Sequence, residues 1–388
     1  MTQRVAILTE IISPYRIPVF NELAKQKGID LKVIFLSETD PTLRQWLVYK
    51  DEIRFSYEVL PSWRFRAGRS HLLLNRGVAT SLKNFSPQAI ICGGYSYVAS
   101  WQALRWARRR KVKVRFVLWS ESNAQDARAE HKMVEFSKAT FTKRCDGFVV
   151  PGKSAFEYLR SLGSTAENIF TAPNAVDNMF FATQAESVRG RADEFREKLK
   201  LPSRFILFVG RLVPEKGVFD LFDAYAKLEG SVRSEVGLVF AGDGVSREEL
   251  KQRARQISPG VVFFPGFAQR EDLAGLYALA EALVLPTHSD PWGLVVNEAM
   301  ACGLPIIVSD VAGCCADLVD DGWNGYVVPP RDSERLSVAI DSLVRQPERR
   351  RKMGEHCLER IRNYSPEACA SGLAAAAISA GTEARWIP

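Results

Sequence analysis

The sequence has little of what a metal centre or a disulfide framework requires. Its 388 residues hold only 4 histidines and 7 cysteines, and no two cysteines have the C-x-x-C spacing. Without a Cys/His cluster, no zinc site is expected. The odd number of cysteines and their apolar neighbours predict reduced thiols in a cytoplasmic protein. The adjacent Cys314 and Cys315 fit either a redox pair or two small buried residues, and the second interpretation is favoured.

Long apolar runs are also lacking. No segment reaches the length of a membrane-spanning helix. The start of the chain carries Arg4 and Glu10, and it has the pattern of a strand and a loop rather than of a signal peptide. With 46% hydrophobic residues, the chain is long enough for two domains that each bury a core.

The second half of the chain has no excess of positive charge, because the whole excess lies in the first half. Residues 1–172 hold 27 Lys and Arg against 15 Asp and Glu, whereas residues 173–388 hold 25 against 30. This asymmetry predicts that the first half meets an anionic partner, for which nucleic acid, an anionic membrane face and a phosphorylated substrate all qualify.

Two clusters mix arginines with aromatic residues in this basic half. They are WRFRAGRSHLLLNR at 63–76 and RWARRRKVKVR at 105–115. A solvated helix face is the default interpretation of such a run. The alternatives are a surface that lies on anionic lipid or one that follows a nucleic-acid backbone.

Short apolar runs recur along the chain with helical patterns between many of them. Because these runs do not alternate strictly, they predict parallel strands that are covered on both faces. They lie at 4–9, 31–36, 88–94, 112–120 and 146–151, and again at 204–210, 235–242, 260–266, 281–286, 304–309 and 324–329. We predict an α/β protein with two doubly wound sheets and a junction at 178–200.

Ligands of such sheets collect beyond the carboxyl ends of the strands. Arg211 and Lys216 follow the strand at 204–210, and a helix is expected to begin near Val218. Two cations beside a helix N-terminus can bind a diphosphate, although exposed cations are often only solvated. Glycines follow the next two strands, where they permit either a close ligand or a tight turn. These are Gly242, Gly244 and Gly266.

The stretch DPWGLVVNEAMACG at 290–303 joins a loop to a predicted helix. Its first amides, at Gly293, Leu294 and Val295, are suited to a phosphate oxygen. Asp290 precedes the helix, where it would accept hydrogen bonds from ligand hydroxyls or cap the helix. Glu298 lies within an apolar helix, so either it binds a ligand or it is a surface residue.

Together these motifs resemble the retaining glycosyltransferases of family 4, which have the GT-B fold. The resemblance spans roughly residues 170–330 and follows the family's order and spacing. It is carried by PNAVD at 173–177, VGRLVPEKG at 209–217, AGDG at 241–244, PG at 265–266 and DPWGLVVNEAMACGLPIIVSD at 290–310.

The resemblance implies two Rossmann-like doubly wound domains that face each other across a cleft. Residues 1–175 would bind the acceptor, residues 176–363 would bind a nucleotide sugar, and residues 364–388 would cross back as a helix onto the first domain. The implied reaction is retaining transfer from a UDP- or GDP-sugar to a glycan, a lipid-linked acceptor or a small molecule in polysaccharide or glycoconjugate biosynthesis. No metal and no cofactor besides the nucleotide sugar would be needed.

The resemblance also implies roles for single residues. Arg211 and Lys216 would stabilise the leaving diphosphate, and Glu298 would bind the ribose. Asp290 would contact the donor sugar, at a position where the family usually has the first glutamate of E-x7-E. Because aspartate is one methylene shorter than glutamate, this departure leaves the identity of the donor sugar undetermined. Glu121 follows the strand at 112–120, near the place of a family histidine that reaches the sugar.

The loop after the first strand lacks the glycine pair that the family usually has there. Tyr15 and Arg16 would contact acceptor or donor phosphate, or else belong to a packed loop. His288 is close enough to Asp290 in sequence to reach the sugar as well. Given the basic half, a membrane-associated or polyanionic acceptor is favoured, with the protein peripheral on the inner face of the membrane.

Two competing functions remain at this point. A nucleotide-sugar epimerase shares the two-domain architecture, but the Arg211–Lys216 loop and the two acids favour transfer. A nucleic-acid-binding protein would explain the basic half, but no recognised RNA- or DNA-binding module is visible.

Overall fold

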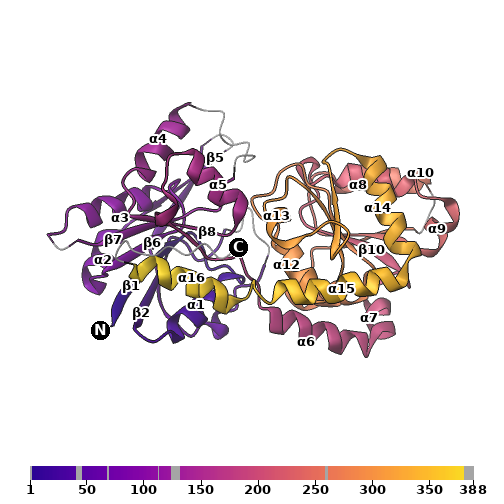
Figure 1. Ribbon diagram of the computed structural model, residues 1–388, viewed down its shortest axis with the longest axis horizontal. Coiled ribbons are helices and arrows are strands. Elements are labelled where there is room, and N and C mark those ends of the chain that lie inside the picture. The colour runs from indigo at the N-terminus through magenta and orange to yellow at the C-terminus, as the bar shows by residue number, and fades with distance from the viewer. Residues whose placement is uncertain are drawn as a thin grey trace. The chain divides into compact units, whose positions relative to one another are not determined.

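The computed structural model describes residues 2–40, 46–67, 70–111, 113–123, 132–257 and 261–379. The chain divides into two compact units. The N-terminal unit comprises Met1–Val176 with Ser365–Pro388, and the C-terminal unit comprises Asp177–Tyr364. Each unit is built on a parallel sheet, so the predicted α/β class is confirmed (Figure 1). The limits predicted for the domains lie within one residue of those of the units.

The sheet of the N-terminal unit has the order β3-β2-β1-β6-β7-β8-β9 among the described residues. Its strands are β1 (Gln3–Thr9), β2 (Ile29–Phe35), β3 (Ser56–Val59), β6 (Ala89–Cys92), β7 (Arg115–Trp119), β8 (Gly147–Val150) and β9 (Ile169–Thr171). The helices are α1 (Arg16–Lys25), α2 (Val78–Phe85), α3 (Val98–Arg108), α4 (Lys132–Thr142), α5 (Lys153–Ser161) and α16 (Pro366–Ile378), with short 3-10 turns at Lys50–Glu52 and Ala166–Asn168.

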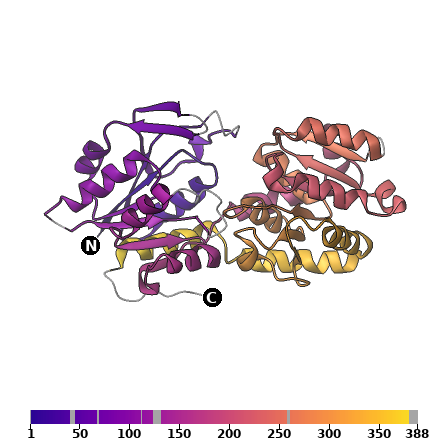
Figure 2. The same cartoon turned by 90° about the horizontal axis from the view of Figure 1, so that it is seen from above.

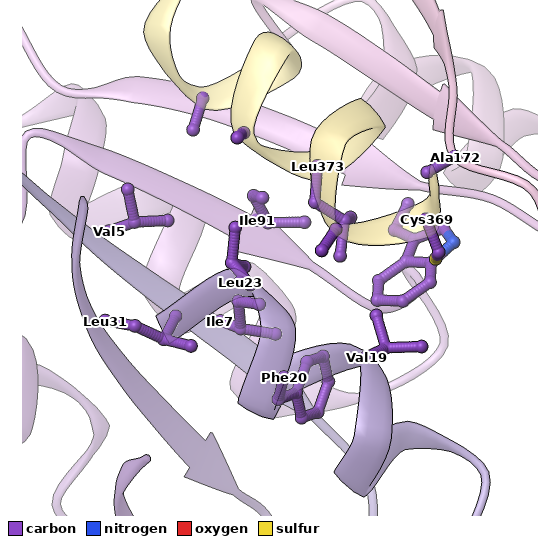
Figure 3. Close-up of a cluster of buried hydrophobic side chains, with 14 of the residues drawn as sticks. Val5, Ile7, Val19, Phe20, Leu23, Leu31, Ile91, Ala172, Cys369 and Leu373 are labelled. Atoms are coloured by element: carbon purple, nitrogen blue, oxygen red, sulfur yellow. The ribbon is translucent and has the colours of Figure 1, made fainter. Parts of the chain in front are cut away.

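Both faces of this sheet are buried, because successive side chains of a strand point to opposite sides. Val5 and Ile7 of β1 belong to a cluster with residues of α1 and α16. Ala6 and Leu8 belong to a second cluster, with residues of α2 and α3. Figure 3 shows the first cluster between the two helices and the sheet. The absence of strict alternation in the apolar runs therefore has the predicted cause.

The C-terminal helix α16 packs closely on the N-terminal unit. A Cβ atom at Gly372 would lie only 2.1 Å from the carbonyl oxygen of Thr171, so the backbones approach too closely for any other residue. At the end of the helix, Gln3 Nε2 donates to the carbonyl of Ala377 (2.8 Å), and Arg115 Nε donates to that of Ala376 (2.7 Å). These donors satisfy carbonyls that a helix end leaves unpaired.

The cluster at 63–76 forms an antiparallel hairpin of β4 (Ser62–Ala67) and β5 (Ser70–Asn75), so its default interpretation as a helix face was wrong. Residues 68 and 69 lie outside the described residues. The aromatic residues Trp63 and Phe65 favour a strand over a helix for β4. Strands β3 and β9 were also not predicted.

The sheet of the C-terminal unit has the order β12-β11-β10-β13-β14-β15, with all strands parallel. Its strands are β10 (Phe205–Val209), β11 (Gly237–Ala241), β12 (Val262–Gly266), β13 (Leu283–Leu285), β14 (Ile306–Ser309) and β15 (Gly325–Val328). Its helices are α6 (Asn178–Arg189), α7 (Ala192–Leu199), α8 (Val218–Ala226), α9 (Gly230–Glu235), α10 (Arg247–Ile257), α11 (Arg270–Leu279), α12 (Leu294–Ala301), α13 (Cys315–Leu318), α14 (Ser333–Arg345) and α15 (Pro347–Ile361), with a 3-10 turn at Pro214–Lys216.

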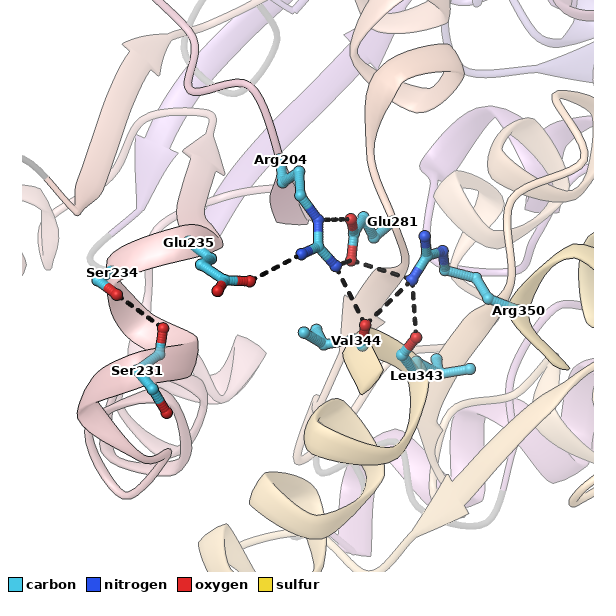
Figure 4. Close-up of polar contacts among 8 residues, drawn as sticks. All are labelled: Arg204, Ser231, Ser234, Glu235, Glu281, Leu343, Val344 and Arg350. Carbon is cyan, nitrogen blue, oxygen red and sulfur yellow. Dashed lines mark hydrogen bonds and ion pairs between the residues drawn. The ribbon is translucent and has the colours of Figure 1, made fainter. Parts of the chain in front are cut away.

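An ion-pair network fastens the amino ends of this sheet to α14 and α15 (Figure 4). Glu281, which precedes β13, accepts from Arg204 Nε (2.5 Å) and pairs with Arg350 Nη1 (3.2 Å). The two guanidinium groups also donate to the carbonyls of Val344 and Leu343. The hydrogen bond to Glu281 raises the pKa of Arg204 above its ordinary value. Because the network lies at the amino edge, it is structural.

No helix in the described ranges combines the length and the apolar character that crossing a bilayer requires.

Candidate functional site

The strand order of the C-terminal unit reverses between β10 and β13, which are neighbours in the sheet. At such a switch point the loops after the two strands turn to opposite sides and leave a crevice at the carboxyl edge. The loop after β10 carries Arg211 and Lys216, and the loop after β13 carries His288 and Asp290. Four of the predicted site residues therefore lie at the position that the topology favours for a ligand.

The side chains of Lys216 and Asp290 form an ion pair. Their Nζ and Oδ2 atoms lie 2.5 Å apart, and each side chain is 15% exposed. Arg211 lies five residues before Lys216 on the same loop and is exposed. The loop thus presents one exposed cation and one that a carboxylate of the neighbouring loop holds in place.

Backbone hydrogen bonds tie the two loops together. The amide of His288 donates to the carbonyl of Glu215 (2.8 Å), and the hydroxyl of the buried Thr287 donates to the same carbonyl (3.0 Å). His288 Nε2 also contacts the carboxylate of Asp220 in the first turn of α8. The loops are therefore one connected structure, with His288 held on its α8 side.

Helix α12 begins beside Asp290. Gly293 is its N-cap residue, with φ of 98°, and no side chain caps the helix. Asp290 Oδ1 accepts from the amide of Trp292 (3.2 Å), so it orders the turn before the helix instead of capping it. Leu294 and Val295 form the half-buried first turn of α12. Its uncapped amides keep the donors that suit a phosphate oxygen.

Glu298 is completely buried in α12, and the hydroxyl of Tyr277 in α11 donates to its Oε2 atom (2.6 Å). The expectation of a ligand rested on the cost of burying a carboxylate without a partner. The structure supplies a protein partner, so burial by itself no longer argues for a ligand. The surface alternative for Glu298 was wrong, because the residue has no exposed area.

The glycines after β11 allow two loops to pack together. A Cβ atom at Gly242 would lie 1.9 Å from the carbonyl oxygen of Gly210, and one at Gly244 would lie 2.3 Å from that of Leu212. The spaces that these glycines leave are filled by the loop after β10. Gly266 ends β12 in a left-handed conformation, with φ of 90°. The group that approaches Gly242 and Gly244 closely is therefore protein backbone.

In the N-terminal unit, Arg16 and Glu121 form an ion pair beyond the carboxyl ends of β1 and β7. The Arg16 guanidinium lies 4.0 Å from the ring centroid of Trp119. Tyr15 packs edge-on against Trp46, with centroids 5.7 Å apart. The structure therefore brings Tyr15 into a packed loop, and it joins Arg16 to Glu121, two residues that the sequence pattern had placed in separate roles.

The cysteines are all free thiols, and six of the seven are buried. Burial raises the pKa of Cys315 to about 12 and that of Cys314 well above its ordinary value. Such thiols are poor nucleophiles, which supports their interpretation as small buried residues. Among the described residues, no three His, Cys, Asp or Glu side chains gather as a metal site would require.

Two residues of this region were not predicted from the sequence. Asp220, the partner of His288, is one of several acids in an amphipathic helix. Tyr277, the partner of Glu298, lies among apolar residues of α11 and is itself fully buried. Neither position carries a local pattern that distinguishes it, because each contact joins elements that are distant in the chain.

Comparison with known proteins shows what the segment that carries this site is similar to. Residues 191–359, which lie within the C-terminal unit, match the family model described as glycosyl transferases group 1. Over this segment the chain is similar to that family, which confirms the resemblance of the motifs to group 1 glycosyltransferases.

Individual relatives match about half of the chain. The α-D-kanosaminyltransferase of Streptomyces kanamyceticus is 32% identical over 203 residues, covering 52% of this chain and 51% of the relative. The D-inositol 3-phosphate glycosyltransferase of Frankia alni is 32% identical over 214 residues, covering 52% of each chain. The chain therefore spans about half the length of these curated relatives.

Solved structures extend the similarity to both units at the level of the fold. Anabaena HepE in complex with UDP has a TM-score of 0.74 and 18% identity, covering 96% of this chain and 98% of that one. The sucrose-phosphate synthase of Thermosynechococcus elongatus has a TM-score of 0.71 and 21% identity, covering 96% and 97%. These similarities and the two parallel sheets show the GT-B fold that the motifs had implied.

Proposed function

We propose that the protein is a retaining glycosyltransferase that transfers a sugar from a UDP- or GDP-sugar to a glycan, a lipid-linked acceptor or a small molecule in polysaccharide or glycoconjugate biosynthesis. The observation that carries the proposal is the connected pair of loops at the switch point, with Arg211, Lys216 and Asp290 beside the N-terminus of α12. The family match of residues 191–359 supports it, as do the relatives, which are named as glycosyltransferases.

In this proposal the loops receive the donor's diphosphate. Breaking the bond between sugar and phosphate leaves additional negative charge on the diphosphate. Arg211, Lys216 and the first amides of α12 are cationic or dipolar groups fixed at one place, so they would stabilise this charge without reorganising. The transfer would then need neither a metal ion nor a cofactor other than the nucleotide sugar.

The ion pair between Lys216 and Asp290 would change when the donor binds. A diphosphate competes with the carboxylate for the Lys216 ammonium group. Release would leave Asp290 able to accept hydrogen bonds from the hydroxyls of the donor sugar. Asp290 thus keeps Lys216 in position before binding and contacts the sugar afterwards, while His288 is a neighbour that would contact the sugar on the α8 side.

The remaining predicted residues have supporting roles in the proposal. Glu298 would bind the ribose hydroxyls in place of the Tyr277 hydroxyl, after its covering side chains move. Arg16 and Glu121 would act on the acceptor or donor from the N-terminal unit as an ion-paired couple, with Tyr15 supporting their loop.

Replacing Lys216 by alanine tests the diphosphate site. We expect sugar transfer to fall by about 100- to 1000-fold, as on removal of a group that stabilises developing negative charge. Lys227→Ala is the matched control, because Lys227 lies on the surface at the end of α8 and pairs with the exposed Glu334. Transfer by Lys216→Ala at the rate of the control would refute the site.

The donor is identified by a thermal-shift screen with UDP-, GDP-, ADP- and dTDP-sugars. We expect stabilisation by one uridine or guanosine nucleotide sugar and loss of that stabilisation in Lys216→Ala. NMR analysis of the product's anomeric centre then tests retention, and transfer in the presence of EDTA tests metal independence. Stabilisation by none of the four donors would contradict the proposal.

The two other functions considered from the sequence are not favoured by the family match. The nucleic-acid-binding function would be supported by two results together: the wild-type chain transfers no sugar, and the Lys216→Ala variant still binds nucleic acid.

A further inference from the structure

The two basic clusters of the sequence come together on one surface of the N-terminal unit. The cluster at 63–76 forms the β4–β5 hairpin, and the cluster at 105–115 begins in α3, which packs against β5. A concavity of about 420 Å³ lies between them. Its lining residues are Trp63, Phe65, Leu74, Asn75, Arg76, Val98 and Gln102. Figure 2 shows the hairpin on the side of the unit away from the yellow helix α16.

The hairpin turns one of its two faces outward. In the strand register, Arg64 lies opposite Leu73. Both residues belong to the inner face of the hairpin, because Leu73 is only 2% exposed and Arg64 forms an ion pair with the buried Asp40. The outer face includes the two cross-strand pairs that flank this pair, Trp63 with Leu74 and Phe65 with Leu72. Trp63, Phe65 and Leu72 are 44%, 53% and 42% exposed.

Such exposure is costly without a partner. Single exposed apolar residues are common on protein surfaces, but a contiguous exposed group marks an interaction site. Here four apolar side chains share one face of one hairpin, and Val98 of α3, which is 38% exposed, lines the same concavity. The outer face therefore has the composition of a docking surface.

The apolar concavity continues into a row of cations. Val98, Gln102, Arg105 and Arg109 are spaced by four, three and four residues, which places them on one face of α3 and its C-cap. Arg105 and Arg109 are exposed. The exposed Arg76 lines the concavity itself and lies 5.0 Å from the centroid of the Trp63 ring. The same surface thus combines apolar side chains with arginines from two elements.

We propose that this hairpin surface, made of Trp63, Phe65, Leu72, Leu74, Val98, Arg76, Arg105 and Arg109, docks on an anionic lipid bilayer. The apolar side chains enter the boundary between headgroups and acyl chains, where tryptophan is favoured. The arginines remain level with the lipid phosphates.

Charge complementarity selects this partner. The N-terminal unit holds 28 Lys and Arg against 17 Asp and Glu, whereas the C-terminal unit holds 24 against 28. An anionic surface therefore attracts the unit that carries the hairpin surface. The proposal goes beyond the proposed function, because it uses no residue of the donor loops.

Co-sedimentation of the full chain with vesicles tests the proposal. Vesicles of phosphatidylcholine alone are compared with vesicles of equal parts phosphatidylcholine and phosphatidylglycerol. We expect binding to the anionic vesicles, weaker binding at higher salt because the lipid charges are screened, and little binding to the neutral vesicles. Failure of the wild-type chain to sediment with anionic vesicles would overturn the proposal.

Two pairs of substitutions locate the contact. The first pair, Phe65→Ser with Leu72→Ser, removes two apolar side chains. The second pair, Arg105→Gln with Arg109→Gln, removes two charges, each of which should contribute about five-fold to the vesicle partition coefficient. We expect each pair to lower the vesicle partition coefficient by about ten-fold or more. The controls lie on the α1 and α16 side of the unit. They are Ile378→Ser, at a side chain that is 51% exposed, and Lys25→Gln with Lys27→Gln.

Equal loss of binding in the control variants would show unspecific attraction and overturn the assignment to this surface. Circular dichroism checks that each variant is folded, and the thermal shift with a nucleotide sugar reports the donor site separately. The proposal would also be overturned if the chain did not bind vesicles and a soluble oligosaccharide quenched the fluorescence of Trp63. That result would assign the concavity to a glycan.

Discussion

The two units share a parallel-sheet architecture but use their surfaces differently. In the C-terminal unit, Arg211, Lys216, His288 and Asp290 lie at the switch point between β10 and β13, and polar contacts fix three of these side chains. In the N-terminal unit, the exposed aromatic and basic residues gather on a hairpin outside the main sheet. A sheet edge can hold one small ligand by a few polar groups, whereas the surface of a hairpin and its neighbouring helix offers a larger contact area.

The units also differ in how they are completed. The C-terminal unit is continuous in sequence, whereas the N-terminal unit needs Ser365–Pro388 from the far end of the chain. Helix α16 places Cys369, Ala370, Leu373 and Ala374 in the same cluster as β1 and α1. The stability of one unit therefore depends on the tail of the chain, and that of the other does not.

Ending the chain after Tyr364 should have the largest effect. It uncovers the apolar face of β1 and α1, so we expect the N-terminal unit to lose about 4 kcal/mol or more of unfolding free energy. Hydrogen exchange read by segment should show lost protection in β1 and β6 and unchanged protection in β10 and β11. The exposed substitution Ile378→Ser should leave both units intact. Protected β1 amides in the shortened chain would break the comparison.

Glu281→Ala should destabilise the C-terminal unit by about 2 kcal/mol, because it removes a buried carboxylate and leaves the partly exposed Arg204 and Arg350 without their shared partner. Urea denaturation measures the loss. Glu235→Ala removes the exposed partner of Arg204 and should cost less than about 1 kcal/mol. Donor affinity should not change in either variant, since the network lies at the amino edge. A weakened donor affinity would contradict that separation.

Tyr277→Phe removes the hydroxyl that donates to Glu298 and keeps the ring. We expect a loss of about 1 kcal/mol in unfolding free energy, the usual contribution of a buried hydrogen bond. If Glu298 exchanges the Tyr277 hydroxyl for ribose hydroxyls, calorimetry should show that Tyr277→Phe binds the nucleotide more tightly than the wild-type chain. Glu298→Gln should bind the nucleotide more weakly. Unchanged nucleotide affinity in both variants would leave Glu298 with a structural role alone.

Asp290→Asn should have the smallest effect on binding. The amide oxygen can still accept from the amide of Trp292, but the charge that pairs with Lys216 is gone. We expect UDP to bind up to about five-fold more tightly, the range of a partly exposed ion pair, while sugar transfer falls. Asp243→Asn makes the same charge change in the neighbouring loop after β11. Equal tightening in both variants would indicate a general charge effect.

Much of the fold followed from local patterns. Each of the eleven predicted strands overlaps a strand of the structure, because strands that are buried on both faces must be apolar along their length. The helices at 218–226 and 294–301 followed from their periodicity and end signals. The hairpin was missed, since its arginine-rich sequence has the composition of a solvated surface run and not of a buried strand.

The sequence by itself determined the class of the protein, the repetition of the doubly wound sheet and the loops in which the site residues lie. These features depend on residues within one strand, one helix or one motif. Only the tertiary structure decided that Lys216 pairs with Asp290, that Tyr277 satisfies Glu298 and that the clusters at 63–76 and 105–115 form one surface. Such contacts join residues that are distant in the chain, and they depend on the order in which strands pair, which no local pattern records.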